Sequence, residues 1–182
     1  MTTTYDVRAV RAGEWRQIKA LRLRALGDEA APIAFLESLA EASARPDEFW
    51  QERARGSSVE AGPRAGARQF VAVTEDGEWV GTAVGRIEQA GDVDFEGAVV
   101  SRTGGHVVGV FLCPEHRGRG VLGRLFQAVT HWLREAGLDH VRLYVHADNV
   151  RAQRSYEKLG FEPTGTRISG SIGTEIEMAR PL

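Results

Sequence analysis

The sequence predicts one mixed α+β domain, residues 1–182, built around a central strand–helix–strand unit. Two β-type runs, Phe70–Val73 and Trp79–Ile87, flank the turn sequence Glu-Asp-Gly-Glu and predict a hairpin. A buried strand at His106–Cys113 leads through a glycine-rich turn into the helical pattern of Val121–Ala136. The length suits a single core, since typical domains contain roughly 100–200 residues. Strands and helices therefore alternate within one domain.

The N-terminal third predicts a strand followed by two helices. Tyr5–Val10 alternates as a strand does, and apolar residues over 15–27 recur at helical spacing up to Gly27. A loop is expected at 28–35. Pro46 with the acids that follow it predicts a second helix start, since proline suits the first turn and acids suit the positive helix end. The segment 56–67 has no periodicity and predicts a flexible loop.

The C-terminal half continues the alternation. A long acidic loop, also expected to be flexible, is predicted at 89–105. After the central helix come a strand at Val141–His146 and a short helix at Asn149–Leu159. Two last strands, Phe161–Ile168 and Ile172–Met178, read as a terminal pair. The expected order is β-α-α-β-β-β-α-β-α-β-β.

Composition excludes several functional classes. The net charge of −2 gives no global attraction for a polyanion, so no nucleic-acid partner is expected. The single cysteine, Cys113, excludes an intramolecular disulfide and a cysteine-rich zinc site, and no metal is expected. No apolar run approaches the ~20 residues that span a bilayer, and Met1–Val10 lacks a signal core. We therefore expect a cytoplasmic protein with no membrane partner.

The turn between the buried strand and the central helix has the features of an anion-binding site. Its sequence, Cys113–Gly123, contains three glycines and the arginines Arg117 and Arg119. Glycines let backbone N–H groups approach a ligand, and a helix N-terminus adds free N–H groups and partial positive charge. Guanidinium groups add further donors. The turn therefore suits a pyrophosphate.

This turn alone is compatible with three interpretations. Gly118–Gly123 matches the dinucleotide-binding pattern G-x-G-x-x-G, and Asp148 follows the next strand, where a ribose-binding acid would stand. The turn also suits the pyrophosphate of another cofactor, or no ligand at all. A dinucleotide fold normally begins near its glycine turn and continues with further strand–helix units. Only about sixty residues follow this turn, which disfavours the dinucleotide interpretation.

Two blocks together resemble the GNAT acetyltransferase superfamily. Arg117-Gly118-Arg119-Gly120 looks like its pyrophosphate motif R/Q-x-x-G-x-G/A, although Leu122 replaces the final small residue. Leu143–Asn149 leading into Tyr156–Phe161 resembles the family's strand–Asn–helix–Tyr–Leu–Gly–Phe signature. The close resemblance covers Val107–Phe161, and the last residues, 177–182, resemble the family's final strand.

The resemblance implies a twisted, mostly antiparallel sheet flanked by helices, with a βαβ unit that binds acetyl-CoA as cosubstrate. It implies direct acetyl transfer in a ternary complex to a primary amine of a small molecule or protein, and homodimers are common among similar proteins. Gly109 suits a bulge that splays the buried strand from its neighbour. The coenzyme-binding residues implied are Val110, Phe111, Leu112, Arg117, Gly118, Arg119, Gly120, Val121, Leu122 and Asn149.

Tyr156 is the implied general acid, which would protonate the departing thiolate; without the motif it reads as a helix tyrosine packed on the core. The base is less defined. His106 falls where some relatives place a glutamate, and its pKa range suits a base or a water relay. Glu96 and His146 are weaker candidates, and an ordered-water relay needs no single base. An acyl-Cys113 intermediate is not expected, because no neighbour clearly depresses that thiol's pKa.

The acceptor is expected to approach near the 28–35 and 89–105 loops. Acidic side chains there would attract a cationic amine: Asp28, Glu29, Glu37, Asp92, Asp94 and Glu96. Two alternatives remain open at this point. One is a catalytically silent module that binds acetyl-CoA, which would not need Tyr156. The other is a dinucleotide-dependent oxidoreductase.

Overall fold

A computed structural model describes residues 4–94 and 97–182 and contains a seven-stranded sheet in the order β1-β2-β3-β4-β5-β7-β6. Neighbouring strands are antiparallel except for β4 and β5. The strands are β1 (Tyr5–Ala9), β2 (Ala67–Thr74), β3 (Trp79–Glu88), β4 (Gly104–Leu112), β5 (His140–His146), β6 (Glu162–Gly170) and β7 (Gly173–Pro181). The mixed, mostly antiparallel sheet expected from the sequence is confirmed.

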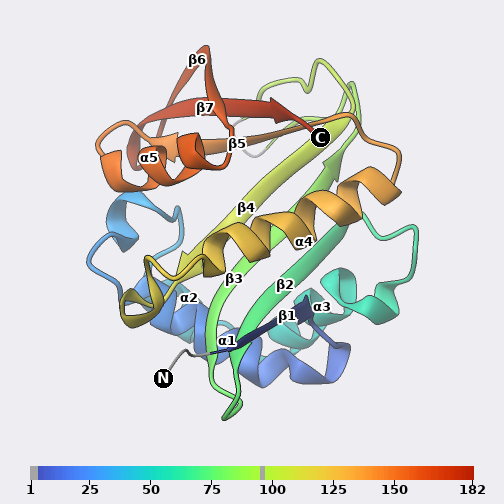
Figure 1. The fold of residues 1–182 in the computed structure, drawn as a ribbon, viewed down its shortest axis with the longest axis vertical. Helices are drawn as coiled ribbons and strands as arrows, with labels where there is room; N and C mark the ends of the chain where they lie inside the picture. The colour runs from blue at the N-terminus through green and yellow to red at the C-terminus, as the bar shows by residue number, and fades with distance from the viewer. Residues whose placement is uncertain (1–3, 95–96) are drawn as a thin grey trace.

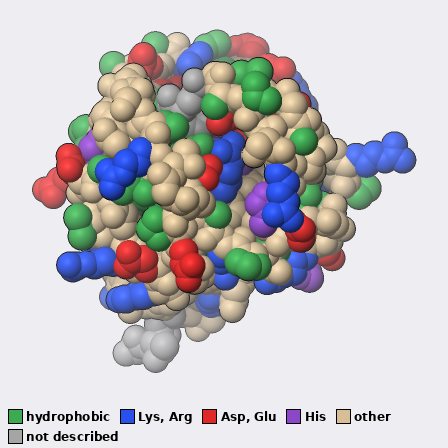
Figure 2. Space-filling view, turned by 90° about the horizontal axis from the view of Figure 1, so that it is seen from above, with side chains coloured by type: hydrophobic (Ala, Val, Ile, Leu, Met, Phe, Trp, Pro, Cys, Tyr) green, Lys and Arg blue, Asp and Glu red, His purple; other side chains and the backbone are tan. Residues whose placement is uncertain are grey.

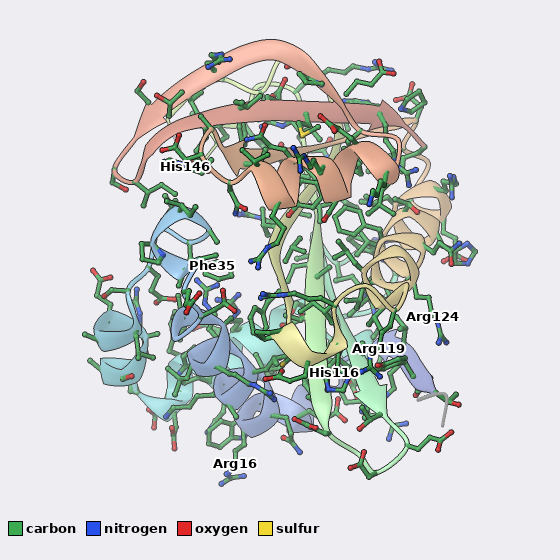
Figure 3. All side chains as sticks on the ribbon, turned by 60° about the vertical axis from the view of Figure 1, so that its left-hand side comes forward. Arg16, Phe35, His116, Arg119, Arg124 and His146 are labelled. Atoms are coloured by element: carbon green, nitrogen blue, oxygen red, sulfur yellow. The ribbon has the colours of Figure 1, made fainter. Side chains whose placement is uncertain are left out.

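Helices cover both faces of this sheet (Figures 1 and 3). On one face lies α4, and on the other lie the helices that precede β2. The helices are α1 (Trp15–Leu26), α2 (Leu39–Ala44), α3 (Asp47–Ser57), α4 (Val121–Glu135) and α5 (Val150–Lys158). The arrangement leaves α5 beside the β5–β7–β6 part of the sheet (Figure 1).

Close packing of α4 fixes the position of the glycine-rich turn that precedes it. Leu125, Val129 and Leu133 lie at helical spacing and are fully buried against the sheet. The sheet accommodates them because β4 has a glycine there: a Cβ on Gly105 would stand 2.6 Å from the Leu133 side chain. Larger residues in β4 would push α4 away from the sheet, and the turn with it.

The region before β2 contains more helix than the sequence predicted. A short helix, α2, follows Ser38, whose hydroxyl accepts from the Glu41 N–H while the Glu41 carboxylate accepts from the Ser38 N–H. This capping box was the overlooked signal. The segment predicted as the 56–67 loop begins inside α3 and continues as a 3₁₀ turn, Val59–Ala61. Only its last residues join β2 without helical structure.

Strands β4 and β5 are paired only at their first residues. Their parallel register joins Gly105 to Val141 and His106 to Arg142, and no later pair of the described residues continues it. On the other side, β4 stays paired with β3 as far as Leu112. The two central strands therefore diverge and open the sheet beside the end of β4.

Surface features agree with the modest net charge. Acidic and basic side chains are interspersed over the face viewed from above (Figure 2). Within residues 4–94 and 97–182, none of the helices has both the length and the apolar character that crossing a bilayer requires.

Candidate active site

A cleft of about 510 Å³ opens where β4 and β5 diverge. One wall is β4 from Val107 to Leu112, and the opposite wall is formed by Leu143–His146 of β5 and by α5. The glycine turn closes one end, and residues of the 28–35 segment border the cleft. Phe35, from the segment after α1, and His146, at the end of β5, both line the cleft and are labelled in Figure 3. The coenzyme-binding residues named from the sequence line this cleft except Arg119; Tyr156 also lines it, whereas His106 does not.

The β4 wall contains the bulge that Gly109 was expected to permit. Thr82 pairs with Phe111 while Val84 pairs with Val108, so β4 carries one extra residue in this stretch. Gly109 has a φ of +61°, a conformation that side-chain-bearing residues rarely adopt. A bulge interrupts the ladder and leaves a residue unpaired. Backbone groups beside Val110 can therefore serve a ligand in the cleft instead of β3.

The turn before α4 has the geometry of an anion cradle. Gly118 and Gly120 have φ values of +74° and +77°, and Gly120 is the residue that caps the helix. Successive N–H groups converge in such turns. The first-turn N–H groups of Val121, Leu122 and Gly123 have no acceptor within the helix. The cradle therefore rests on backbone groups, and the Leu122 departure adds an apolar side chain to the cleft wall without closing the turn.

Arg117 has a different environment from the one expected. Its Nε donates to the Leu112 carbonyl at 3.0 Å, and its Nη2 donates to Asp28 at 2.7 Å. Burial alone would raise the pKa of Asp28, but the Ala30 N–H and Arg117 hold that pKa below its ordinary value. The guanidinium thus ties the turn to the segment after α1. Arg119 is exposed and stands outside the residues that line the cleft.

Helix α5 contributes polar residues that sequence reasoning missed. Arg151, Ser155 and Lys158 line the cleft. Their spacing of four and three residues places them on one face of a helix, and this was the available signal. Asn149 caps the helix by accepting from the Ala152 N–H at 3.2 Å, which leaves its amide NH₂ available to donate. The two added cations favour an anionic ligand at this side of the cleft.

Tyr156 combines the two roles that the sequence left as alternatives. Its ring packs against Phe126 and Phe161, and the residue is only 9% exposed. It also lines the cleft. Among the described residues none is hydrogen-bonded to its hydroxyl. Burial raises the pKa of Tyr156 to about 12, so the phenol keeps its proton throughout the physiological range.

His106 lies at the start of β4, outside the cleft lining and only 1% exposed. Its Nδ1 lies 2.7 Å from Glu88 Oε1, and its ring meets that of Tyr144 edge-on at 5.7 Å. An ionised carboxylate only accepts, so Nδ1 carries the proton in this pair. The Tyr144 ring that His106 contacts does line the cleft.

Arg142 organises the polar groups around His106. Its guanidinium donates to Glu88 at 2.8 Å, to Glu177 at 2.9 Å and to the Tyr144 hydroxyl at 2.6 Å. Burial alone would raise the pKa of Glu88, but hydrogen bonds from His106 and Arg142 lower it to about 2. Sequence reasoning missed this cluster, because its members come from β3, β5 and β7.

Of the two weaker base candidates, His146 has both ring nitrogens engaged, and Glu96 lies outside the described residues. His146 lines the cleft, but its Nε2 lies 2.9 Å from the Ile172 carbonyl and its Nδ1 accepts from the Asp148 N–H. Burial raises the pKa of Cys113, which opposes a nucleophilic thiolate.

Several acids expected to attract the acceptor are already paired. Asp28 binds Arg117, Glu37 lies between Arg22 and Arg45, and Asp94 binds Arg142. Asp92 accepts from the Gln89 N–H within its own loop. Their charge is largely compensated, so the loops themselves provide less attraction for a cation than their composition suggests.

The divergent central strands, the bulge and the glycine turn border one cleft, in a mixed sheet of the kind found in acetyltransferase folds. The sequence model of the Acetyltransferase (GNAT) family matches residues 31–161. The chain belongs to this family. A dinucleotide-binding fold is built from repeated parallel strand–helix units, whereas β4 and β5 form the single parallel pair among the described strands, which disfavours the dinucleotide interpretation.

Curated relatives carry acetyltransferase names. A mycothiol acetyltransferase of Rhodococcus opacus (strain B4) is 46% identical over 66 residues, which are 36% of this chain and 21% of that protein. An aminoglycoside N(6')-acetyltransferase type 1 of Stenotrophomonas maltophilia is 32% identical over 95 residues, 52% of this chain and 60% of that protein. The match thus spans about a fifth of the length of the mycothiol acetyltransferase.

Solved structures support the fold. The ribosomal-protein-S5-alanine acetyltransferase from Vibrio fischeri superposes with a TM-score of 0.70 and 21% identity, covering 100% of this chain and 97% of that one. A ribosomal L7/L12 alpha-N-protein acetyltransferase in complex with coenzyme A superposes with a TM-score of 0.72 and 13% sequence identity. The superposition covers 98% of this chain and 94% of that one. At these identities the likeness concerns the fold alone.

Proposed function

We propose that this chain transfers an acetyl group from acetyl-CoA to the primary amine of a small molecule or protein. One observation carries the proposal: the Gly109 bulge and the Gly118–Gly120 cradle border the same 510 Å³ cleft. The bulge offers backbone groups to a thioester and its pantetheine arm, while the cradle offers N–H groups to a pyrophosphate. The named relatives support the same reaction class.

The residues present fit coenzyme A. Backbone groups near Val110 would hold the acyl end, and the amide NH₂ of Asn149 would donate to the arm. The N-terminus of α4 would bind the pyrophosphate, and the cations Arg151 and Lys158 would face the remaining phosphate. When bound, the cosubstrate supplies a thioester whose carbonyl an amine attacks.

In this mechanism the chain must position the amine, remove one proton from it and return one to sulfur. Tyr156 holds a proton at neutral pH on a hydroxyl without a partner among the described residues, and it borders the cleft. It is our candidate for the donor to the departing thiolate. His106 is shielded from the cleft, so it would receive a proton by a relay, for which Tyr144 is the candidate.

A thiol-release assay with acetyl-CoA and a panel of amines tests the proposal. Amine-dependent release of free thiol, with the N-acetylated amine identified by mass spectrometry, supports acetyl transfer. The silent acetyl-CoA-binding module remains the second candidate. It would bind acetyl-CoA tightly and release no thiol with any amine.

A further inference from the structure

A second, much smaller cavity of about 10 Å³ lies behind the bulge of β4. Its walls include Arg22 of α1, Arg53 of α3 and Gln69 of β2, and we name it the arginine cavity. Gly109 and Phe111 line both this cavity and the large cleft. A group bound in the arginine cavity would therefore adjoin the strand that would hold the acyl group.

Positive charge around this cavity exceeds the negative charge that the protein places beside it. Arg22 and Arg45 share the single carboxylate of Glu37, each at 3.3 Å. The Arg53 guanidinium has no ion pair or hydrogen bond with any described residue. Burial, with Arg22 nearby, lowers the pKa of Arg53. A half-buried cation without a directly bonded partner is costly, and an anionic ligand would lower that cost.

The cavity also presents a hydrogen-bond acceptor. The Thr82 hydroxyl donates to the Phe70 carbonyl at 2.8 Å, so its oxygen can only accept from Gln69 Nε2 at 3.1 Å. This pair fixes the orientation of the Gln69 amide. Gln69 Oε1 is then left buried without a hydrogen-bond partner among the described residues. An N–H donor on a ligand would satisfy it.

Guanidinium donors beside one amide acceptor match a ligand that carries a carboxylate close to an amine. The cavity has room for about one water-sized group, which one carboxylate oxygen fills. The Arg53 guanidinium would repel a ligand that carries several ammonium groups and no anionic group. The acidic side chains around Arg142 would attract a polycation only weakly, because Glu88, Glu177 and Asp94 already accept hydrogen bonds from that guanidinium.

We propose that the arginine cavity binds the carboxylate of the acceptor, so that the acceptor is a carboxylate-bearing primary amine such as an amino acid. Arg53 pairs with the carboxylate oxygen that enters the cavity, with Arg22 as second donor, and the amine of the same molecule stays outside it, toward the cleft. This inference rests on the proposed acetyl transfer. It names the class of acceptor at that site.

The first test compares acceptors that differ only in the carboxylate: alanine with ethylamine, phenylalanine with 2-phenylethylamine, and lysine with cadaverine. The ratio of kcat/KM within each pair, measured by thiol release, should favour the amino acid by at least about tenfold. In Arg53→Gln that ratio should fall to within about twofold of unity. Arg55→Gln is the matched control, because Arg55 is exposed on the same helix, and it should keep the full ratio.

The second test needs no turnover. Titration calorimetry measures binding of N-acetylalanine and N-ethylacetamide to the protein saturated with CoA. The carboxylate-bearing compound should bind at least about tenfold more tightly, and Arg53→Gln should remove the difference. A circular dichroism spectrum identical to wild type excludes misfolding, and Arg22→Gln provides a second variant.

The two tests separate the possible failures. Thiol release that is as fast with the decarboxylated amines as with the amino acids overturns the carboxylate subsite and leaves acetyl transfer standing. Carboxylate-dependent binding without thiol release from any acceptor supports the subsite and contradicts the proposed transfer. Equal binding of both N-acetyl compounds overturns the subsite whatever the turnover.

Discussion

Arg117 Nη2 lies 2.7 Å from Asp28 Oδ2, so an ion pair joins the turn before α4 to the segment after α1, 89 positions away in sequence. Both segments border the cleft. The Leu112 carbonyl accepts from the same guanidinium at 3.0 Å. Arg117, which the resemblance assigns to the pyrophosphate, thus also joins two walls of the cleft that it lines.

This ion pair should be measurable as a coupling energy. Asp28→Ala and Arg117→Ala should each lower the free energy of unfolding by roughly 1–3 kcal/mol, because each leaves a partly buried charge without its partner. The double variant should lose less than the sum, with a coupling on the order of 1 kcal/mol. Urea unfolding of the four proteins checks this. Strict additivity would show that the two residues do not interact in solution.

Tyr156→Phe should lower kcat by roughly a hundredfold and leave the KM for acetyl-CoA nearly unchanged, since the ring still packs and only the proton donor is lost. Steady-state thiol release checks this. Tyr5→Phe is the matched control, because the Tyr5 hydroxyl lies 2.9 Å from His116 Nδ1 and the residue is not part of the cleft lining. If Tyr156→Phe were as active as wild type, the Tyr156 hydroxyl would not be the proton donor, and the ring would serve only in packing.

Gly120→Ala should weaken binding of acetyl-CoA by roughly tenfold or more, because a Cβ at φ +77° strains the cradle and shifts its N–H groups. Gly77 supplies the control, since it has a φ of +89° in the β2–β3 hairpin with no neighbour near its Cβ position. Both variants should lose about 1–2 kcal/mol of stability. Only Gly120→Ala should lose affinity for acetyl-CoA, as measured by calorimetry. A similar loss of affinity in Gly77→Ala would show that the loss results from lower stability and not from a change in the turn.

Glu88 should make the protein sensitive to acid. Its folded-state pKa of about 2 lies below the ordinary value of 4.5, so its stabilising contribution is complete above the ordinary value and is lost as pH falls toward 2. The difference of about 2.5 between the two pKa values corresponds to at most roughly 3–4 kcal/mol. Between pH 6 and pH 3 the wild type should lose more unfolding free energy than Glu88→Gln, as followed by urea denaturation. Parallel losses in the two proteins would assign the acid sensitivity to other carboxyl groups.

The fold was accessible from sequence because its elements have strong local signals. The β2–β3 turn, the apolar face of α4 and Gly160 after α5 each place an element boundary within a few residues. The missed helix α2 has only six residues, and its capping box at Ser38 and Glu41 is its clearest signal. Short helices bury little and leave a weak periodic pattern.

The residues of the cleft could be predicted from the sequence only in part. The glycine turn and the Asn149–Tyr156 block are contiguous in sequence, and the structure brings them to one cleft. The positions of Arg117 and His106 were not accessible, because their partners Asp28 and Glu88 lie far away along the chain. The arginine cavity joins residues of α1, α3 and β2, and no local pattern connects them.

The most direct test of the central claim is a thermal shift measured in parallel with acetyl-CoA, coenzyme A, NAD and NADP. A ligand at about a hundred times its Kd stabilises the native state by roughly 2.7 kcal/mol, which raises Tm by roughly 5–10 °C in a protein of this size. The account predicts such a shift with acetyl-CoA and coenzyme A and none with the dinucleotides. A shift with NAD or NADP, and none with acetyl-CoA, would contradict it.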